Sequence, residues 1–161
     1  MLKTISLIVV IGCFSAAWAS DDARKNEELN IRDAVFCYLV AKHNAIEPPA
    51  FYLSVSDRAS DSSTGADPPD ELMARFRSYE PPVLKASNCR MDENGATIVD
   101  KKTGKQGLML SASSIKWIAD NEVEVKGGHY WAGRAAEGCT FTLKKRNGVW
   151  RVVKDKRDWI S

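Results

Sequence analysis

The two histidines of the chain, His43 and His129, are its clearest candidates for acid–base chemistry, because imidazole titrates closest to neutral pH. His129 follows Val123 and Val125 at strand spacing and Trp131 continues the series, so these four side chains share one face of a predicted strand. The valines mark that face as buried. We therefore expect His129 and Trp131 to point inward, where a base beside an aromatic wall is typical of a ligand pocket; a hydrogen-bonded core histidine fits the same pattern.

Two tyrosines with apolar neighbours, Tyr38 and Tyr52, could bring hydroxyl groups to the same interior. The predicted ligand pocket thus comprises Tyr38, Tyr52, His129 and Trp131 around a small apolar molecule. His129 is the candidate base if the site is catalytic. The segment 56–69 is rich in Ser, Asp, Gly and Pro, which predicts a mobile loop that could cover this pocket.

The cysteines offer a disulfide rather than a metal site. Cys37 falls in a helical segment, where a free thiol behaves as a small hydrophobe, whereas Cys89 and Cys139 fall in strand-like segments. If a bridge forms, we expect it between Cys89 and Cys139; structural thiols are the alternative. The spacings match neither a zinc site nor a redox pair, so we expect no metal and no cofactor.

The elements that must position these residues follow from hydrophobic periodicity and turn signals. His43 stands near the end of the first helix, where a histidine more often interacts with the helix dipole as a cation than acts as a base. The expected elements are a helix over 27–43, a strand over 50–55, a short helix that opens in the segment 67–71 and is ended by Pro81-Pro82, and strands over 83–91, 108–118, 122–131, 139–145 and 149–154.

Asn147-Gly148 between the last two strands predicts a two-residue hairpin turn. That turn would set Leu143 opposite Val152 and Lys145 opposite Trp150. The order of elements, helices first and strands after, indicates an α+β fold in which two helices pack on a curved antiparallel sheet of about five or six strands.

Composition limits the classes of function. The 161 residues suit a single domain, and a formal net charge of +2 gives no argument for a nucleic-acid partner. The lysines and arginines near the C-terminus are interpreted as protection of an outer strand against edge pairing.

The first nineteen residues read as an export signal. A basic start is followed by an apolar run over 5–19, too short to span a bilayer, which ends in Ala17-Trp18-Ala19. Cleavage after Ala19 would leave residues 20–161 as one exported domain, periplasmic or secreted. An alternative is a lipoprotein signal cut before Cys13, which would then carry the lipid.

Several segments carry a resemblance to a known superfamily, as turn and core signatures spread over residues 34–161. The segments are Ala34-Val35-Phe36 with His43-Asn44, Pro81-Pro82-Val83 with Ser87 and Cys89, Val99-Asp100-Lys101-Lys102-Thr103-Gly104, Ile115-Lys116-Trp117, Glu122 to Gly128, and Asn147-Gly148-Val149-Trp150 with Trp159-Ile160-Ser161. With the order of elements, they resemble the cone-shaped (cystatin-like) α+β superfamily of nuclear-transport-factor-2-like, SnoaL-like and ketosteroid-isomerase-like domains, and more closely small exported bacterial proteins of that type. That superfamily includes isomerases, cyclases, dehydratases and binding modules, so the resemblance implies a fold and leaves the activity open.

These observations favour an exported, non-catalytic domain that binds a small apolar ligand or a protein partner. The alternative is a cofactor-independent isomerase or hydrolase with His129 as base, and a third hypothesis is a homodimer formed through the sheet.

Overall fold

The computed structural model describes residues 15–56, 65–132 and 135–161, with side chains from residue 21 onward. In chain order the elements are α1 (Ser15–His43), η1 (Asn44–Ile46), β1 (Phe51–Ser54), α2 (Asp70–Ala74), β2 (Val83–Lys85), η2 (Ala86–Asn88), β3 (Cys89–Met91), β4 (Ile98–Asp100), β5 (Leu108–Ala119), β6 (Glu122–Ala132), β7 (Ala135–Arg146) and β8 (Val149–Ile160).

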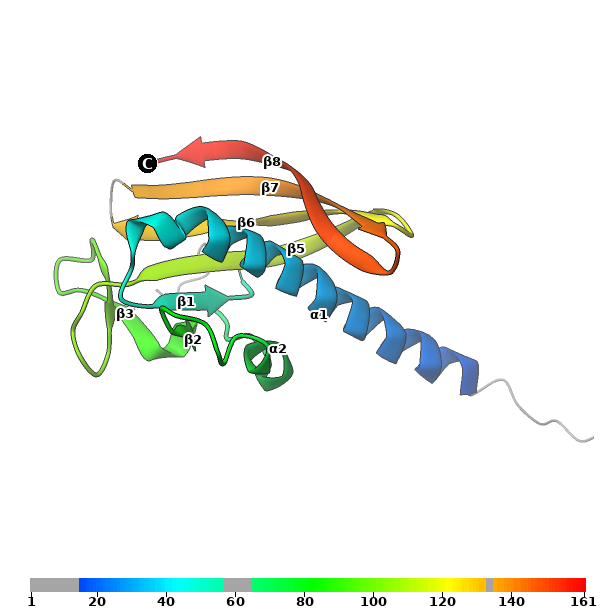
Figure 1. The fold of residues 1–161 in the computed structure, drawn as a ribbon, viewed down its shortest axis with the longest axis horizontal. Helices are drawn as coiled ribbons and strands as arrows, with labels where there is room; N and C mark the ends of the chain where they lie inside the picture. Colours follow the sequence, from blue (N-terminus) through cyan, green and yellow to red (C-terminus); the bar gives the residue numbers. More distant parts are fainter. Residues whose placement is uncertain (1–14, 57–64, 133–134) are drawn as a thin grey trace, which may run out of the picture.

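The main sheet has six strands in the order β2-β1-β5-β6-β7-β8, and α1 lies across one of its faces (Figure 1). The predicted α+β class is therefore confirmed. The prediction of an antiparallel sheet is wrong at one end, because β1 is parallel to both β2 and β5. Parallel strands must begin at the same end of the sheet, so a long connection has to bring the chain back to that end before the second strand starts. Such a connection separates β1 from both β2 and β5.

The main core lies between α1 and the sheet. Ile31, Val35 and Leu39 recur at helical spacing on α1 and are fully or almost fully buried. They pack against alternate residues of the strands, among them Leu110 and Val125. Strand side chains alternate between the two faces of the sheet. The apolar residues that pack against α1 therefore show which side chains of the strands point toward the helix.

A second, smaller core covers part of the opposite face of the sheet, called the outer face below. Tyr52, Met109 and Tyr130 point to this side and pack with Cys89 and Ile98 of the separate β3–β4 sheet. The sequence predicted one strand over 83–91. The chain instead turns through η2 in the middle of that range and carries β3 into the smaller sheet.

The second helix is shorter than predicted. Helix α2 ends at Ala74 and continues as turns, while Leu72 and Phe76 still supply a buried face. Pro81-Pro82 follows, where a helix cannot continue.

The hairpin prediction is confirmed: Leu143 pairs with Val152 and Lys145 with Trp150. Asn147 and Gly148 both have positive φ, as the predicted turn requires. Both strands are longer than expected, and β8 extends to Ile160.

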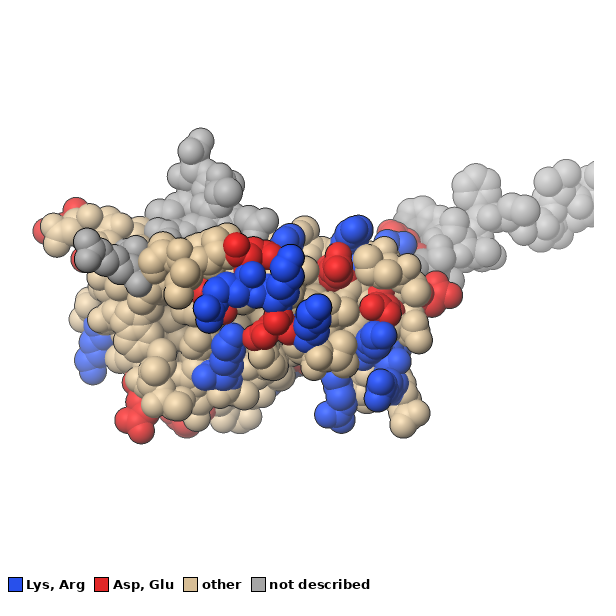
Figure 2. All heavy atoms as spheres, turned by 90° about the horizontal axis from the view of Figure 1, so that it is seen from above, with Lys and Arg blue, Asp and Glu red and all other residues tan. Residues whose placement is uncertain are grey.

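Strand β8 is an edge of the sheet, as interpreted from its lysines and arginines. Figure 2 looks onto the β8 side of the molecule and shows Lys and Arg interspersed with Asp and Glu. The ion pairs along this edge are Lys126–Asp158, Lys42–Asp155 and Arg157–Glu137. The edge therefore carries charge of both signs.

Candidate functional site

A cavity of about 420 Å³ opens on the outer face of the sheet, between β1, β5, β6, β7 and the end of β8. The residues that line it are Ser54, Ser56, Gly65, Met109, Ser111, Lys126, Gly127, His129, Tyr130, Glu137, Gly138, Cys139, Asp158 and Trp159. Its volume falls in the range of about 300–1,000 Å³ that is usual for small-molecule pockets. It is therefore the candidate site.

The cavity exists because the residues that pair with one another across four strands at this level of the sheet are all serine or glycine. Ser54 pairs with Ser111, Ser111 with Gly128, and Gly128 with Gly138. Four neighbouring strands thus each present a hydroxymethyl group or a hydrogen at this level of the sheet. Filling any of these positions with a larger side chain would reduce the cavity.

The two ends of the cavity differ in polarity. One end is closed by Met109 and Tyr130, which pair with each other and belong to the second core. At the other end Lys126 donates hydrogen bonds to Thr140 (2.7 Å) and to Asp158 Oδ2 (2.9 Å), and Thr140 donates to the same carboxylate oxygen (2.6 Å). These hydrogen bonds from Thr140 and Lys126 lower the pKa of Asp158.

Trp159 lies over Gly138, which is its partner in the β7–β8 pairing. A Cβ placed on Gly138 would come within 2.1 Å of the indole Nε1 and 2.4 Å of Cε2. Only a glycine therefore lets the ring rest against the strand, and Trp159 remains 53% exposed. The pairing shifts by one residue between Gly138 and Cys139, so that Asp158 is inserted in β8 and borders the cavity beside Trp159.

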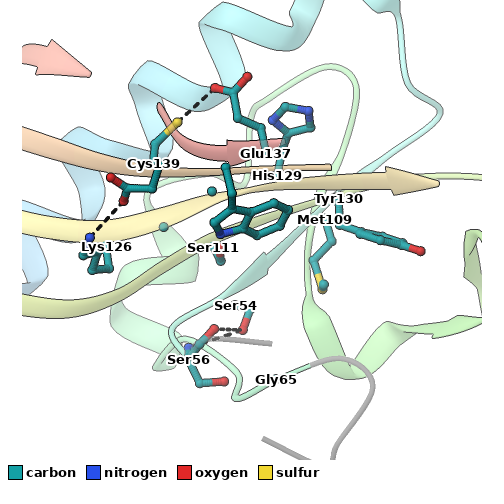
Figure 3. Close-up of a pocket in the computed structure, with 14 residues that line it drawn as sticks. Ser54, Ser56, Gly65, Met109, Ser111, Lys126, His129, Tyr130, Glu137 and Cys139 are labelled. Carbon is teal, nitrogen blue, oxygen red and sulfur yellow. Dashed lines mark hydrogen bonds and ion pairs between the residues drawn. The ribbon is translucent and has the colours of Figure 1, made fainter. Parts of the chain in front are cut away.

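The imidazole of His129 lies on the other face of the sheet. The centre of its ring is 4.2 Å from the centre of the ring of His43, the last residue of α1. Figure 3 shows His129, Glu137 and Cys139 projecting from β6 and β7 to the side opposite Ser54 and Ser56. His129 and Trp131 both lie on the α1 side of β6, and the imidazole does not face the cavity.

Both histidines are neutral at pH 7 in this environment. Burial, followed by the nearby His129 and Lys42, lowers the pKa of His43 to about 4. Burial also lowers the pKa of His129, against the opposing effect of Glu137. The interpretation of His43 as a cation at the helix terminus is therefore wrong, because the helix end is packed against the sheet rather than exposed.

Glu137 connects three elements on the α1 side. Its Oε1 accepts hydrogen bonds from the Cys139 thiol (2.9 Å) and from Lys42 Nζ (3.4 Å), and its Oε2 accepts one from Arg157 Nε (3.1 Å). Burial and the adjacent Glu137 carboxylate raise the pKa of Cys139 to about 12. The thiol is protonated at neutral pH and is therefore a poor nucleophile.

The four residues of the predicted pocket do not meet. The Tyr38 hydroxyl donates to Asp155 Oδ2 (2.6 Å) between α1 and β8, and Trp131 packs against the main core. Tyr52 lies on the opposite face, where its hydroxyl donates to Asp100 Oδ2 (2.8 Å). The prediction of one pocket is wrong, because β1 alternation sends Tyr52 away from the side that Tyr38 and Trp131 share.

The Cys89–Cys139 disulfide is not formed, and Cys37, Cys89 and Cys139 are free thiols. Cys89 belongs to the second core and Cys139 to the main core, so the sheet separates them. Cys89 instead donates to the carbonyl of Ala86 (3.1 Å). Cys13, the alternative lipidation site, lies outside the described residues, as does 57–64 of the predicted loop.

The cavity offers an aromatic surface, serine hydroxyl groups and a paired lysine and carboxylate. His129 is among the lining residues, but its imidazole points to His43 on the α1 side, and Lys126 is paired with Asp158. No cluster of three or more His, Cys, Asp or Glu suited to a metal ion occurs among the described residues. None of the helices in those same ranges is long and apolar enough to cross a membrane.

The residue pattern alone did not identify Ser111, Gly138 and Trp159 as site residues. A signal was available in the hairpin: continuing its register past 154 brings Trp159 close to Gly138. The one-residue shifts in that pairing could not be read from the sequence pattern. Comparison of the chain with protein-family models, curated proteins and solved structures gave no significant match.

Proposed function

We propose that this chain is a binding module whose outer cavity holds one small organic molecule with a flat apolar face and a polar edge. The observation that carries the proposal is the exposed indole of Trp159, held against Gly138 beside the row of small residues. A large, rigid aromatic surface beside a hollow is a favourable place for a planar ligand.

The rest of the lining supports the same ligand shape. Met109 and Tyr130 offer apolar contact at one end, and the hydroxyl of Ser111 and the carboxylate of Asp158 offer hydrogen bonds elsewhere. A mostly apolar hollow with a few convergent polar groups is what small-molecule sites have in common. The proposal keeps the small-ligand prediction made from the sequence and moves it to the opposite face of the sheet.

Fluorescence titration with 1-anilinonaphthalene-8-sulfonate, a planar apolar probe with an anionic edge, tests the proposal. We expect saturable binding at one site per chain. Ser111→Phe should weaken it about tenfold or more, because the ring occupies the hollow. The matched control is Ser114→Phe, an exposed position farther along β5, which should bind as the unmodified chain does.

Circular dichroism of both variants shows whether they fold. Equal weakening by both substitutions, or no saturable binding by the unmodified chain, would overturn the proposal. Unchanged binding in folded Ser111→Phe would do the same.

We also propose that the protein is exported, which the apolar run over 5–19 and the Ala17-Trp18-Ala19 ending support. Helix α1 runs through Ala19, and residues before Ser15 lie outside the described structure. N-terminal sequencing after expression in a bacterium tests this. A chain that starts at Ser20 supports it, and one that retains Met1 contradicts it.

The cone-shaped superfamily remains our proposal for the fold relationship. The long helix across one face of a six-stranded sheet supports it. The parallel pairing of β1 weighs against it.

A further inference from the structure

We propose that the outer cavity binds a neutral saccharide, whose sugar ring stacks on the indole of Trp159 while its hydroxyls bond to Asp158 and to the serines of the opposite wall. This inference rests on the proposed binding function and names the chemical class of its ligand. Three observations carry it: the aromatic surface, the polar network at its edge, and the pairing of Lys126 with Asp158 in that network.

The aromatic surface suits a sugar ring. A pyranose presents a face of C–H groups, which carry partial positive charge, and the indole face is the negative part of its quadrupole. Trp159 is held against Gly138 on one side, and its exposed fraction of 53% leaves surface for a ligand. The exposed part of the indole makes no contribution to the packing of the sheet.

The polar network offers the directional hydrogen bonds that sugar hydroxyls need. Asp158 uses Oδ2 for both Lys126 and Thr140, and Oδ1 accepts no hydrogen bond from the residues that the structure describes. Lys126 is half-exposed and can donate a further hydrogen bond. Across the cavity stand the half-buried hydroxyl groups of Ser56 and Ser111, whereas Ser54 is buried and its hydroxyl bonds to the backbone of Ser56. Donors and acceptors therefore flank the aromatic surface on two sides.

The charges at the site indicate a neutral ligand. Lys126 and Asp158 form an ion pair at 2.9 Å, so their charges cancel where a ligand would enter. A ligand that placed an anionic group beside the indole would bring it against the Asp158 carboxylate, and one that placed a cationic group there would bring it against Lys126. A purely hydrocarbon ligand would leave these polar groups without the partners that water supplies, which is unfavourable. A polyhydroxylated neutral molecule satisfies all of them.

Isothermal titration calorimetry with chitotriose, cellotriose and maltotriose tests this inference. We expect at least one trisaccharide to bind and to displace 1-anilinonaphthalene-8-sulfonate from the cavity. Trp159→Ala should lower the affinity for that trisaccharide about tenfold, because the stacking surface is lost. Asp158→Asn should lower it about fivefold, because a charged hydrogen-bond acceptor is lost.

The matched control is Val149→Ala. Val149 lies on the same strand and is 51% exposed, close to the value for Trp159, but it is remote from the cavity. The Val149→Ala variant should bind the trisaccharide with unchanged affinity. A Trp159→Phe variant keeps an aromatic ring and should retain part of the binding, which separates stacking from a general loss of structure.

The outcomes separate the two proposals. If the fluorescent probe binds in the Ser111-dependent manner but no trisaccharide binds, the saccharide inference is overturned and the binding function stands. If neither binds, both are overturned. Trisaccharide binding that Val149→Ala weakens as much as Trp159→Ala also overturns the inference.

Discussion

Single side chains of this protein have their partners fixed by the face on which strand alternation places them. Tyr52 is the clearest case: it is 1% exposed, and its hydroxyl bonds to Asp100 in the second core. Burial, followed by the adjacent Asp100, raises the pKa of this phenol, so it stays protonated as a donor.

Tyr52→Phe is expected to lower the free energy of unfolding by about 1 kcal/mol, the usual net contribution of one hydrogen bond. Asp100 keeps its bonds to Lys102 and Thr103, so the loss should stay small. Urea unfolding measures it. Probe binding in the outer cavity should not change, and a tenfold loss of affinity would instead support the original prediction that Tyr52 is a ligand residue.

At the scale of elements, the end of α1 is attached to the sheet by a pair of neutral histidines. His43 of α1 contacts His129 of β6. The charged groups around the pair are Lys42 on α1, Glu137 on β7, and Asp155 and Arg157 on β8. Burial is the main reason that protonating either imidazole is unfavourable; the nearby Lys42 adds to this effect and Glu137 opposes it.

We expect stability to fall as pH decreases from about 6.5 to about 4. In that window an unfolded histidine binds a proton, whereas folded His43, with its pKa lowered to about 4, does not. Most of the carboxylate contribution is lost at lower pH, because the pKa values of Asp155 and Glu137 are also lowered. Urea unfolding at pH 7.5, 6.5, 5.5 and 4.5 measures the slope.

His43→Gln should flatten this slope, whatever its effect at pH 7.5. An unchanged slope in the variant would show that His43 does not carry the effect.

The contact between β7 and β8 at Gly138 is the second element-scale feature. Gly138→Ala places a methyl group where the Trp159 indole lies, so we expect a cost of about 1–3 kcal/mol from overpacking. In a Trp159→Ala background the same change should cost much less, because its obstacle is gone. A double-mutant cycle by urea unfolding checks this. Equal costs in the two backgrounds would contradict the described contact.

The elements with local signals were the ones predicted correctly. Asn147-Gly148 specified a turn and a register, and the valines of β6 specified which way His129 points. The parallel pairing of β1 depends on contacts between segments far apart in the chain, which no local pattern encodes. The cavity was not predicted for a related reason. Its floor is the row of small residues across β1, β5, β6 and β7, and only the pairing register of these four strands brings those residues together.

At the scale of the whole molecule, two cores on opposite faces of the sheet stabilise the fold without a covalent link. Cys89 and Cys139 lie in different cores. We expect reductant to leave the urea midpoint unchanged. Alkylation of the denatured, unreduced chain should label Cys37, Cys89 and Cys139 alike, and a cross-linked Cys89–Cys139 peptide would contradict the structure.

We claim that a small molecule occupies the outer cavity, and chemical-shift mapping by NMR follows that binding residue by residue. During titration with 1-anilinonaphthalene-8-sulfonate, we predict the largest shifts at the Trp159 indole N–H and at the backbone amides of Ser111, Gly128 and Gly138. Shifts confined to residues around His43 on the α1 side, or spread evenly over the surface, would contradict the claim.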